Sequence, residues 1–195
     1  MKLKKFYQKD LKEEELEQID EKQKENYRIL QRKLAQGQWN KKQKKYQKRS
    51  ILPKLALYKT FRGFGYEKDE AKALTKKLQD RESLQANKLL RILFKIPKFK
   101  RPFVHIFKTT MEGDEVWETK VFRADDQEFR FDITKCTWKE SCDFLGYPDM
   151  CTIFCDGDDV FFGGMDELRF RRCSTLAKGA DQCDFKFVFP QREKR

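Results

Sequence analysis

The sequence predicts an α+β fold, in which N-terminal helices are followed by a mostly antiparallel sheet of about four strands with helices packed on it. Up to about residue 94, apolar residues recur at helical spacing. From about residue 103 the pattern changes to short segments that are rich in β-branched and aromatic residues or that alternate apolar with polar residues. Helices first and strands second is the order typical of the α+β class.

Residues 1–50 are predicted to form a charged helical extension ahead of a domain that spans residues 51–195. The apolar stripe of this extension is interrupted by Gln23 and is too narrow for a deeply buried helix; it comprises Leu16, Ile19, Tyr27, Leu30 and Leu34. Gly37 is expected to end the helix. The basic run over residues 41–49 predicts a solvated, frayed helix or a linker. An electrostatic arm for RNA or an acidic membrane is the alternative.

The domain is expected to begin with two helices. A short helix over residues 55–61 should end at Gly63 and Gly65, and a longer one over about 67–94 should stop before Pro97. Two later helices are predicted over residues 138–145 and from about Pro148. The segments with strand character are residues 103–109, 116–122, 129–133, 168–174 and 185–189.

The charge distribution argues against nucleic-acid binding as the main function. The net charge is +12, but residues 1–50 hold 16 Lys/Arg and 8 Asp/Glu, so most of the excess lies in the extension. No apolar run approaches the length of a membrane span, and the N-terminus lacks the apolar core of a secretory signal. We therefore expect a cytoplasmic protein whose six cysteines are thiols.

The cysteine spacing does not predict a metal site or a cofactor. No Cys-x-x-Cys pair occurs, and His105 is the one histidine of the chain. A structural zinc site would need cysteines that converge from distant segments. Cys142, Cys151 and Cys173 are expected to be packing residues.

Two cysteines nevertheless have the surroundings of a reactive site. Cys155 and Asp158 stand three residues apart and would share one face of a helix. The nearby carboxylate would raise the thiol pKa, so an active thiolate would need a donor such as Arg172. Cys136 is expected where a strand turns into a helix, and the N-terminal end of that helix would lower its pKa. The alternative for both is an ordinary buried cysteine.

Several segments in register resemble the bacterial L-2-amino-thiazoline-4-carboxylic acid hydrolase family. The closing signature of that family is similar to Arg172, Thr175-Leu176, Gly179 and Cys183-Asp184-Phe185. Upstream, residues 131–136, residues 145–148 and Cys155 with Asp158 are similar in order and spacing. The resemblance covers roughly residues 51–189. Cys173 departs from it, because a threonine is expected there.

The resemblance implies hydrolysis of a carbon–nitrogen bond in a small cyclic amidine or amide, such as a 2-aminothiazoline carboxylate. In that interpretation Cys155 attacks the amidine carbon or orients a water, Asp158 handles protons, and Cys136 is a second thiol of the site. Substrate-binding roles fall to Arg172, which would pair with a carboxylate, and to Thr175, Cys183 and His105. We expect a core or rim position for His105, because its neighbours are apolar.

The same closing segment also resembles 4-vinyl reductase-type small-molecule-binding domains, which implies an alternative without catalysis. The cysteines would then line an apolar cavity, or bind a metal through Cys136, Cys155 and Cys183. Both interpretations have a small molecule as the partner. The identity of that molecule and the oligomeric state stay open.

Overall fold

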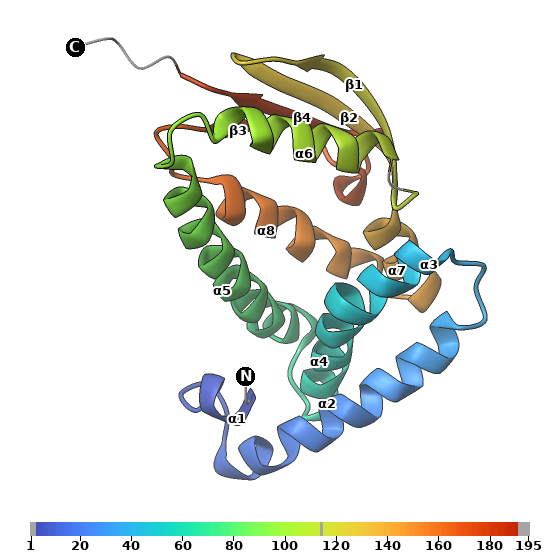
Figure 1. Ribbon diagram of the computed structural model, residues 1–195. Coiled ribbons are helices and arrows are strands. Elements are labelled where there is room, and N and C mark those ends of the chain that lie inside the picture. Colours follow the sequence, from blue (N-terminus) through green and yellow to red (C-terminus); the bar gives the residue numbers. More distant parts are fainter. Residues whose placement is uncertain (1–2, 114, 191–195) are drawn as a thin grey trace.

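The predicted α+β class is confirmed by the computed structural model, which describes residues 3–113 and 115–190 (Figure 1). Helices α1–α6 come first, and β1–β4 follow with α7 and α8 between β2 and β3. The helices are α1 (Leu3–Phe6), α2 (Glu13–Leu34), α3 (Lys41–Tyr46), α4 (Leu52–Gly63), α5 (Lys68–Phe94), α6 (Lys100–Gly113), α7 (Thr137–Leu145) and α8 (Thr152–Phe162). The strands are β1 (Trp117–Ala124), β2 (Glu128–Cys136), β3 (Arg169–Arg171) and β4 (Cys183–Val188).

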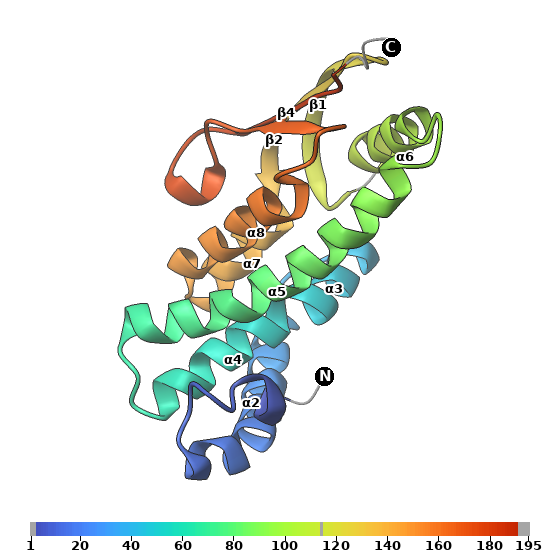
Figure 2. The ribbon, with the colours of Figure 1, turned by 90° about the vertical axis from the view of Figure 1, so that its left-hand side faces the viewer.

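The sheet has four strands in the order β1-β2-β4-β3, and each neighbouring pair is antiparallel. Its buried face is built by alternation, because every second side chain of a strand points to the same side. That face comprises Phe129, Phe131 and Ile133 of β2 and Cys183, Phe185 and Phe187 of β4. Helices α6 and α8 lie on this side of the sheet (Figure 2).

Two clusters of buried side chains form the core. The first joins α2, α4, α7 and the start of α5, and it includes Tyr7, Ile19 and Phe61, none of which is exposed. The second joins the sheet to α6 and to the C-terminal ends of α5 and α8. Short turns link these elements: a π-helical turn over Gln47–Ile51 and 3-10 turns over Pro148–Cys151 and Leu176–Lys178.

The prediction of a strand over residues 103–109 is wrong, because this segment lies within α6. Phe103, Phe107 and Met111 recur every fourth residue and pack towards the sheet, as one face of a helix does. His105, Ile106 and Thr109, which lie between them, are exposed. The sequence did not reveal the helix, because a short run of apolar residues fits a strand and a buried helix equally well.

The extension is more deeply buried than its sequence predicts. Ile19 is fully buried and Leu30 is 3% exposed, because α2 packs along α4. Gln23, which interrupts the stripe, donates a hydrogen bond from Nε2 to the backbone oxygen of Pro53 (3.3 Å) and so fits the interface. Helix α2 also ends at Leu34, before Gly37.

The basic run over residues 41–49 is helical, and its Lys and Arg side chains are exposed, as predicted for a solvated helix. Packing orders the run, however, so the prediction that it is frayed or a linker is wrong. Gln47 is 1% exposed and donates a hydrogen bond to the hydroxyl of Ser141 on α7 (3.1 Å). Asn40 caps α3 by accepting a hydrogen bond from the backbone N–H of Gln43. The boundary between an extension and a domain at residue 51 stays a prediction.

The predictions for the other helices and turns are confirmed. Helices α4 and α5 match the expected pair, α7 ends at Gly146, and a helical segment begins at Pro148. Gly146 has a φ of 87°, which favours glycine. None of the helices among the described residues is long and apolar enough to cross a bilayer.

Replacement of Ile19 by alanine tests whether α2 is an integral part of the core. Because Ile19 is fully buried, we expect Ile19→Ala to lower the free energy of unfolding by about 2–5 kcal/mol, measured by urea denaturation. Ile29→Ala on the same helix is the matched control. Because Ile29 is 39% exposed, its replacement should lower the free energy of unfolding by about 0.5 kcal/mol or less. Equal losses would contradict the packing of α2.

Candidate functional site

A cavity of about 450 Å³ lies between the two core clusters. Its wall combines Cys151 and Phe154 of the first cluster with Phe131 and Phe185 of the second. Further lining residues come from α3, α5, α6, α7 and α8. The size is that of a pocket for a small organic molecule.

Five of the seven predicted site residues line this cavity: Cys136, Cys155, Asp158, Arg172 and Cys183. The other two are not among its lining residues. Thr175 is buried at the start of the turn before β4, and its hydroxyl has no hydrogen bond among the described residues. His105 lies exposed on α6, so it takes no core position, whereas the adjacent Ile106 lines the cavity.

Arg172 connects the segment after β3 to α8. Its side chain is 3% exposed, and Nη1 donates a hydrogen bond to Oδ2 of Asp158 at 2.9 Å. The other terminal nitrogen, Nη2, donates to the backbone oxygen of Cys155 (2.8 Å) and to the carboxylate of Asp159 (3.1 Å). The guanidinium also lies over the rings of Phe170 and Phe185. This geometry fixes one oxygen of Asp158 on the cavity wall.

Asp158 is the acidic side chain of the cavity wall, and its pKa is shifted. Burial, which disfavours the charged carboxylate, raises the pKa of Asp158 to about 7, although the charge of Arg172 opposes the shift. The side chain keeps 38% of its surface exposed. A carboxyl group with such a pKa can accept or donate a proton at neutral pH.

Three thiols lie in a chain that runs from Cys142 of α7 through Cys151, before α8, to Cys155 of α8. The first raises the pKa of the second, and the second raises the pKa of the third. The hydrogen bond with Cys151 and burial both raise the pKa of Cys155 far above its usual value. The hydrogen bond with Cys142 raises the pKa of Cys151 in the same way. Arg172 lowers the pKa of Cys155, but by less than these effects raise it. Cys155 is therefore a neutral thiol at neutral pH.

Cys136 lies where the sequence predicts it, at the end of β2 and the N-cap of α7, but the predicted fall of its pKa is wrong. Burial raises the pKa of Cys136 to about 12, and the backbone N–H groups of Trp138 and Lys139 offset only part of the rise. Burial likewise raises the pKa of Cys183 to about 11. At this site desolvation therefore raises the pKa of Cys136 by more than the helix N-terminus lowers it.

A metal site made by these thiols finds no support in the structure. Within residues 3–113 and 115–190, no group of three or more His, Cys, Asp or Glu side chains is placed to hold a metal ion. Cys136 and Cys183 instead accept hydrogen bonds from backbone N–H groups.

An aromatic wall of the cavity was not predicted from the sequence. The rings of Trp117 and Trp138 stack at 5.3 Å with planes 8° apart, and Tyr46 lies against both. All three residues line the cavity. They come from β1, α7 and α3, so no sequence spacing connects them. Such a wall suits a flat ligand.

Gln79 and Ser83 of α5 are further polar residues of the wall that the sequence did not indicate. Nε2 of Gln79 donates a hydrogen bond to the Ser83 hydroxyl (3.2 Å), whereas the buried Oε1 of Gln79 has no partner among the described residues. Gly157 of α8 gives this amide its space, because a Cβ there would lie 2.7 Å from Nε2 of Gln79. A buried acceptor without a partner is costly, and a ligand N–H could satisfy it.

Comparison with protein families identifies the chain. The model of the family described as L-2-amino-thiazoline-4-carboxylic acid hydrolase matches residues 43–187. The chain belongs to this family, as its sequence motifs predict. The match includes Tyr46 of the cavity wall, which lies in the predicted extension. Searches of curated proteins and of solved structures found no significant match.

Alkylation of the thiols tests their protonation state. A thiol whose pKa is about 11, as for Cys183, holds far less thiolate at pH 8 than an ordinary one near 8.5. We expect iodoacetamide to label Cys183 at least roughly 100-fold more slowly than the exposed Cys173, measured by peptide mass spectrometry. Comparable rates in the folded protein, with faster labelling of both after denaturation, would contradict the raised pKa.

Proposed function

We propose that this protein is a hydrolase that opens a small, flat, cyclic amidine or amide, such as a 2-aminothiazoline carboxylate, by adding water at the amidine carbon. The observation that carries the proposal is the Arg172–Asp158 pair on the wall of the 450 Å³ cavity. The family membership supports the same reaction class. Because all six cysteines are free thiols, we place the reaction in a reducing cytoplasm.

Asp158 is proposed as the base. Its carboxylate would take a proton from the attacking water, and the new C–O bond at the amidine carbon would form as this proton leaves. The ring then opens when the ring carbon–nitrogen bond at the tetrahedral carbon breaks, and protonated Asp158 returns the proton to the departing nitrogen. Arg172 would hold Asp158 in place and, through the same guanidinium, attract a substrate carboxylate.

Cys155 has two possible roles next to this base. As a neutral thiol it could attack the carbon only after it transfers its proton to Asp158, whose charge raises the Cys155 pKa. Otherwise Cys155 only borders the reacting carbon while water attacks. Cys136, Cys183 and Thr175 are then supporting residues, and His105 would contact a ligand only outside the cavity.

Rates measured as a function of pH test the role of Asp158. Because the carboxylate is the active form of a base, we expect kcat/KM to rise with pH through a midpoint near 7. Asp158→Asn should lower kcat at least about 100-fold and remove this pH dependence. Asp159→Asn is the matched control, because Asp159 bonds to the same guanidinium but does not line the cavity. A full rate with Asp158→Asn would contradict the proposal.

Gln79 is proposed to recognise the substrate amine through its unpaired Oε1. We expect Gln79→Leu to lower kcat/KM roughly tenfold, mainly through KM, because a ligand N–H would lose its acceptor. Gln85→Leu on the exposed side of α5 serves as the control. Equal effects of the two substitutions would exclude direct recognition by Gln79.

A screen of small cyclic amides and amidines, followed by thermal shift and by product formation, tests the proposal as a whole. Turnover that Cys155→Ser abolishes would assign the attack to the thiol, whereas turnover that survives would assign it to water. Compounds that bind in the cavity and are never consumed would favour the alternative, a binding or sensing domain of the 4-vinyl reductase type.

A further inference from the structure

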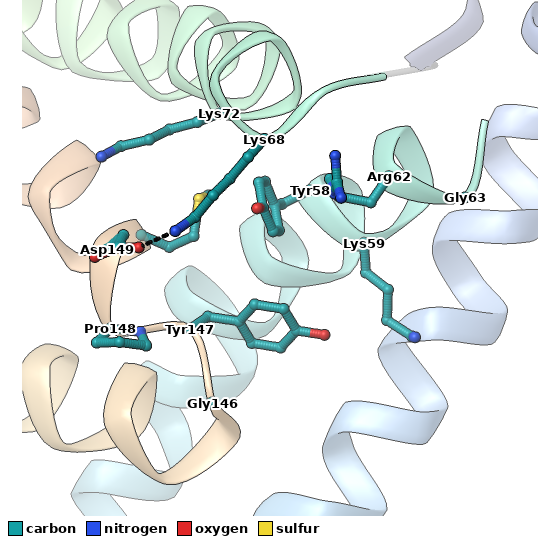
Figure 3. A pocket seen from close by; sticks show the side chains of 11 residues that line it. Tyr58, Lys59, Arg62, Gly63, Lys68, Lys72, Gly146, Tyr147, Pro148 and Asp149 are labelled. Atoms are coloured by element: carbon teal, nitrogen blue, oxygen red, sulfur yellow. Dashed lines mark hydrogen bonds and ion pairs between the residues drawn. The ribbon is translucent and has the colours of Figure 1, made fainter. Parts of the chain in front are cut away.

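A second pocket of about 670 Å³ lies on the side of α4 and α5 where the α7–α8 connection meets them (Figure 3). It shares no lining residue with the thiol cavity. Three segments far apart in the sequence form it: the end of α4, the first turns of α5 and residues 146–150. No step of the proposed reaction uses this place, although residues 146–148 of the family-like segment 145–148 line it.

Positive charge dominates the second pocket. Lys59 and Arg62 of α4 and Lys68 and Lys72 of α5 line it. In Figure 3 the side chains of Lys68 and Lys72 point to the side of Asp149, and that of Lys59 points to the opposite side. Among its described lining residues, Asp149 is the one acidic side chain. With Asp149 counted, the formal charge of the lining is therefore about +3.

Two of these cations already have partners, because Arg62 lies 3.7 Å from Glu67 and Lys68 pairs with Asp149, yet the spacing of all four is unfavourable. Lys59 and Arg62 are three residues apart on one helix, and Lys68 and Lys72 are four apart on the next. Like charges at these spacings are neighbours and repel each other. The α5 N-terminus adds the positive end of a helix dipole to the same place, and Asp69 and Glu70 in its first turn offset part of this charge. An anion in the pocket would relieve the repulsion that these internal partners leave.

The internal ion pair of the pocket can be shared with a ligand. Nζ of Lys68 lies 2.5 Å from Oδ2 of Asp149, and both side chains are more than half exposed, at 63% and 57%. Exposed pairs of this kind contribute little to stability, so an anion that binds Lys68 loses little by competing. Lys68 has three donors and can keep Asp149 while it contacts a second acceptor.

Two tyrosines form the apolar side of the pocket. The rings of Tyr58 and Tyr147 meet edge to face at 5.8 Å, and Tyr58 is only 6% exposed. Burial raises the pKa of Tyr147, so its hydroxyl stays a hydrogen-bond donor at neutral pH. Donors and cations on several sides, with one carboxylate, suit a compact anion that carries several charges.

We propose that this pocket binds the diphosphate group of a small molecule, with Lys68 and Lys72 as its direct cationic partners and with Lys59 and Arg62 adding positive charge from the other side. Inorganic pyrophosphate and the diphosphate of a nucleoside share this chemistry. The proposal does not depend on the hydrolase reaction, because the two sites are lined by different residues.

Calorimetric titration of the full chain at low salt tests the proposal, with pyrophosphate, ADP and adenosine as probes. We expect saturable binding of pyrophosphate and ADP that weakens as KCl is added, and no binding of adenosine. ADP that binds more tightly than pyrophosphate would identify a nucleotide as the source of the group, and equal affinities would identify the diphosphate alone.

Substitution of one lysine assigns the binding to the pocket. Lys72→Glu should weaken pyrophosphate binding at least tenfold, and the milder Lys72→Gln at least threefold. Lys88→Glu is the matched control, because it makes the same charge change at an exposed position on α5 outside the pocket, and its effect should stay within twofold. Circular dichroism of each variant establishes that the fold is intact.

Three results would overturn the proposal. The first is no saturable binding of pyrophosphate by the intact protein. The second is an equal loss with Lys72→Glu and Lys88→Glu, which would mean that net charge alone attracts the anion. The third is a short single-stranded RNA that binds more tightly than pyrophosphate and is weakened equally by both substitutions.

Discussion

The site depends on one buried guanidinium, that of Arg172. This group follows the short strand β3, yet its hydrogen bonds all reach α8, at Asp158, Asp159 and the backbone of Cys155. Since α8 and the sheet both form part of the cavity wall, the same group sets their relative position and influences the protonation of Asp158 on that wall. Removal of Asp158 would leave the buried guanidinium with Asp159 as its remaining acidic partner on α8, which is costly.

The helices and turns followed from local sequence signals, whereas α6 required knowledge of packing. Proline and glycine placed the ends of α4 and α7 correctly, because they act through backbone geometry alone. The apolar run in α6 fits a strand or a helix until the sheet is present to select one face. The burial of α2 was underestimated for a related reason: Gln23 counts as polar in the sequence, but it bonds to a backbone oxygen of α4.

Five of the seven site residues that the sequence predicted line the cavity, whereas the predicted fall in the pKa of Cys136 was wrong. Motif order placed Cys136, Cys155 and Asp158 together, because the family pattern reflects a shared fold. A pKa depends on desolvation and on neighbours such as Cys151, which spacing does not reveal. Gln79 was missed for the same reason, since its role depends on α8 lying against it.

The glycine at position 157 has a consequence for how this cavity could diversify. A methyl group there would meet the amide of Gln79, and the amide, at the end of a flexible side chain, would move before the helix does. The residue at position 157 of α8 therefore determines where the Gln79 amide of α5 lies. Two relatives with identical polar residues around the cavity could thus prefer different ligands because of the residue at this one position, which has no polar side chain of its own.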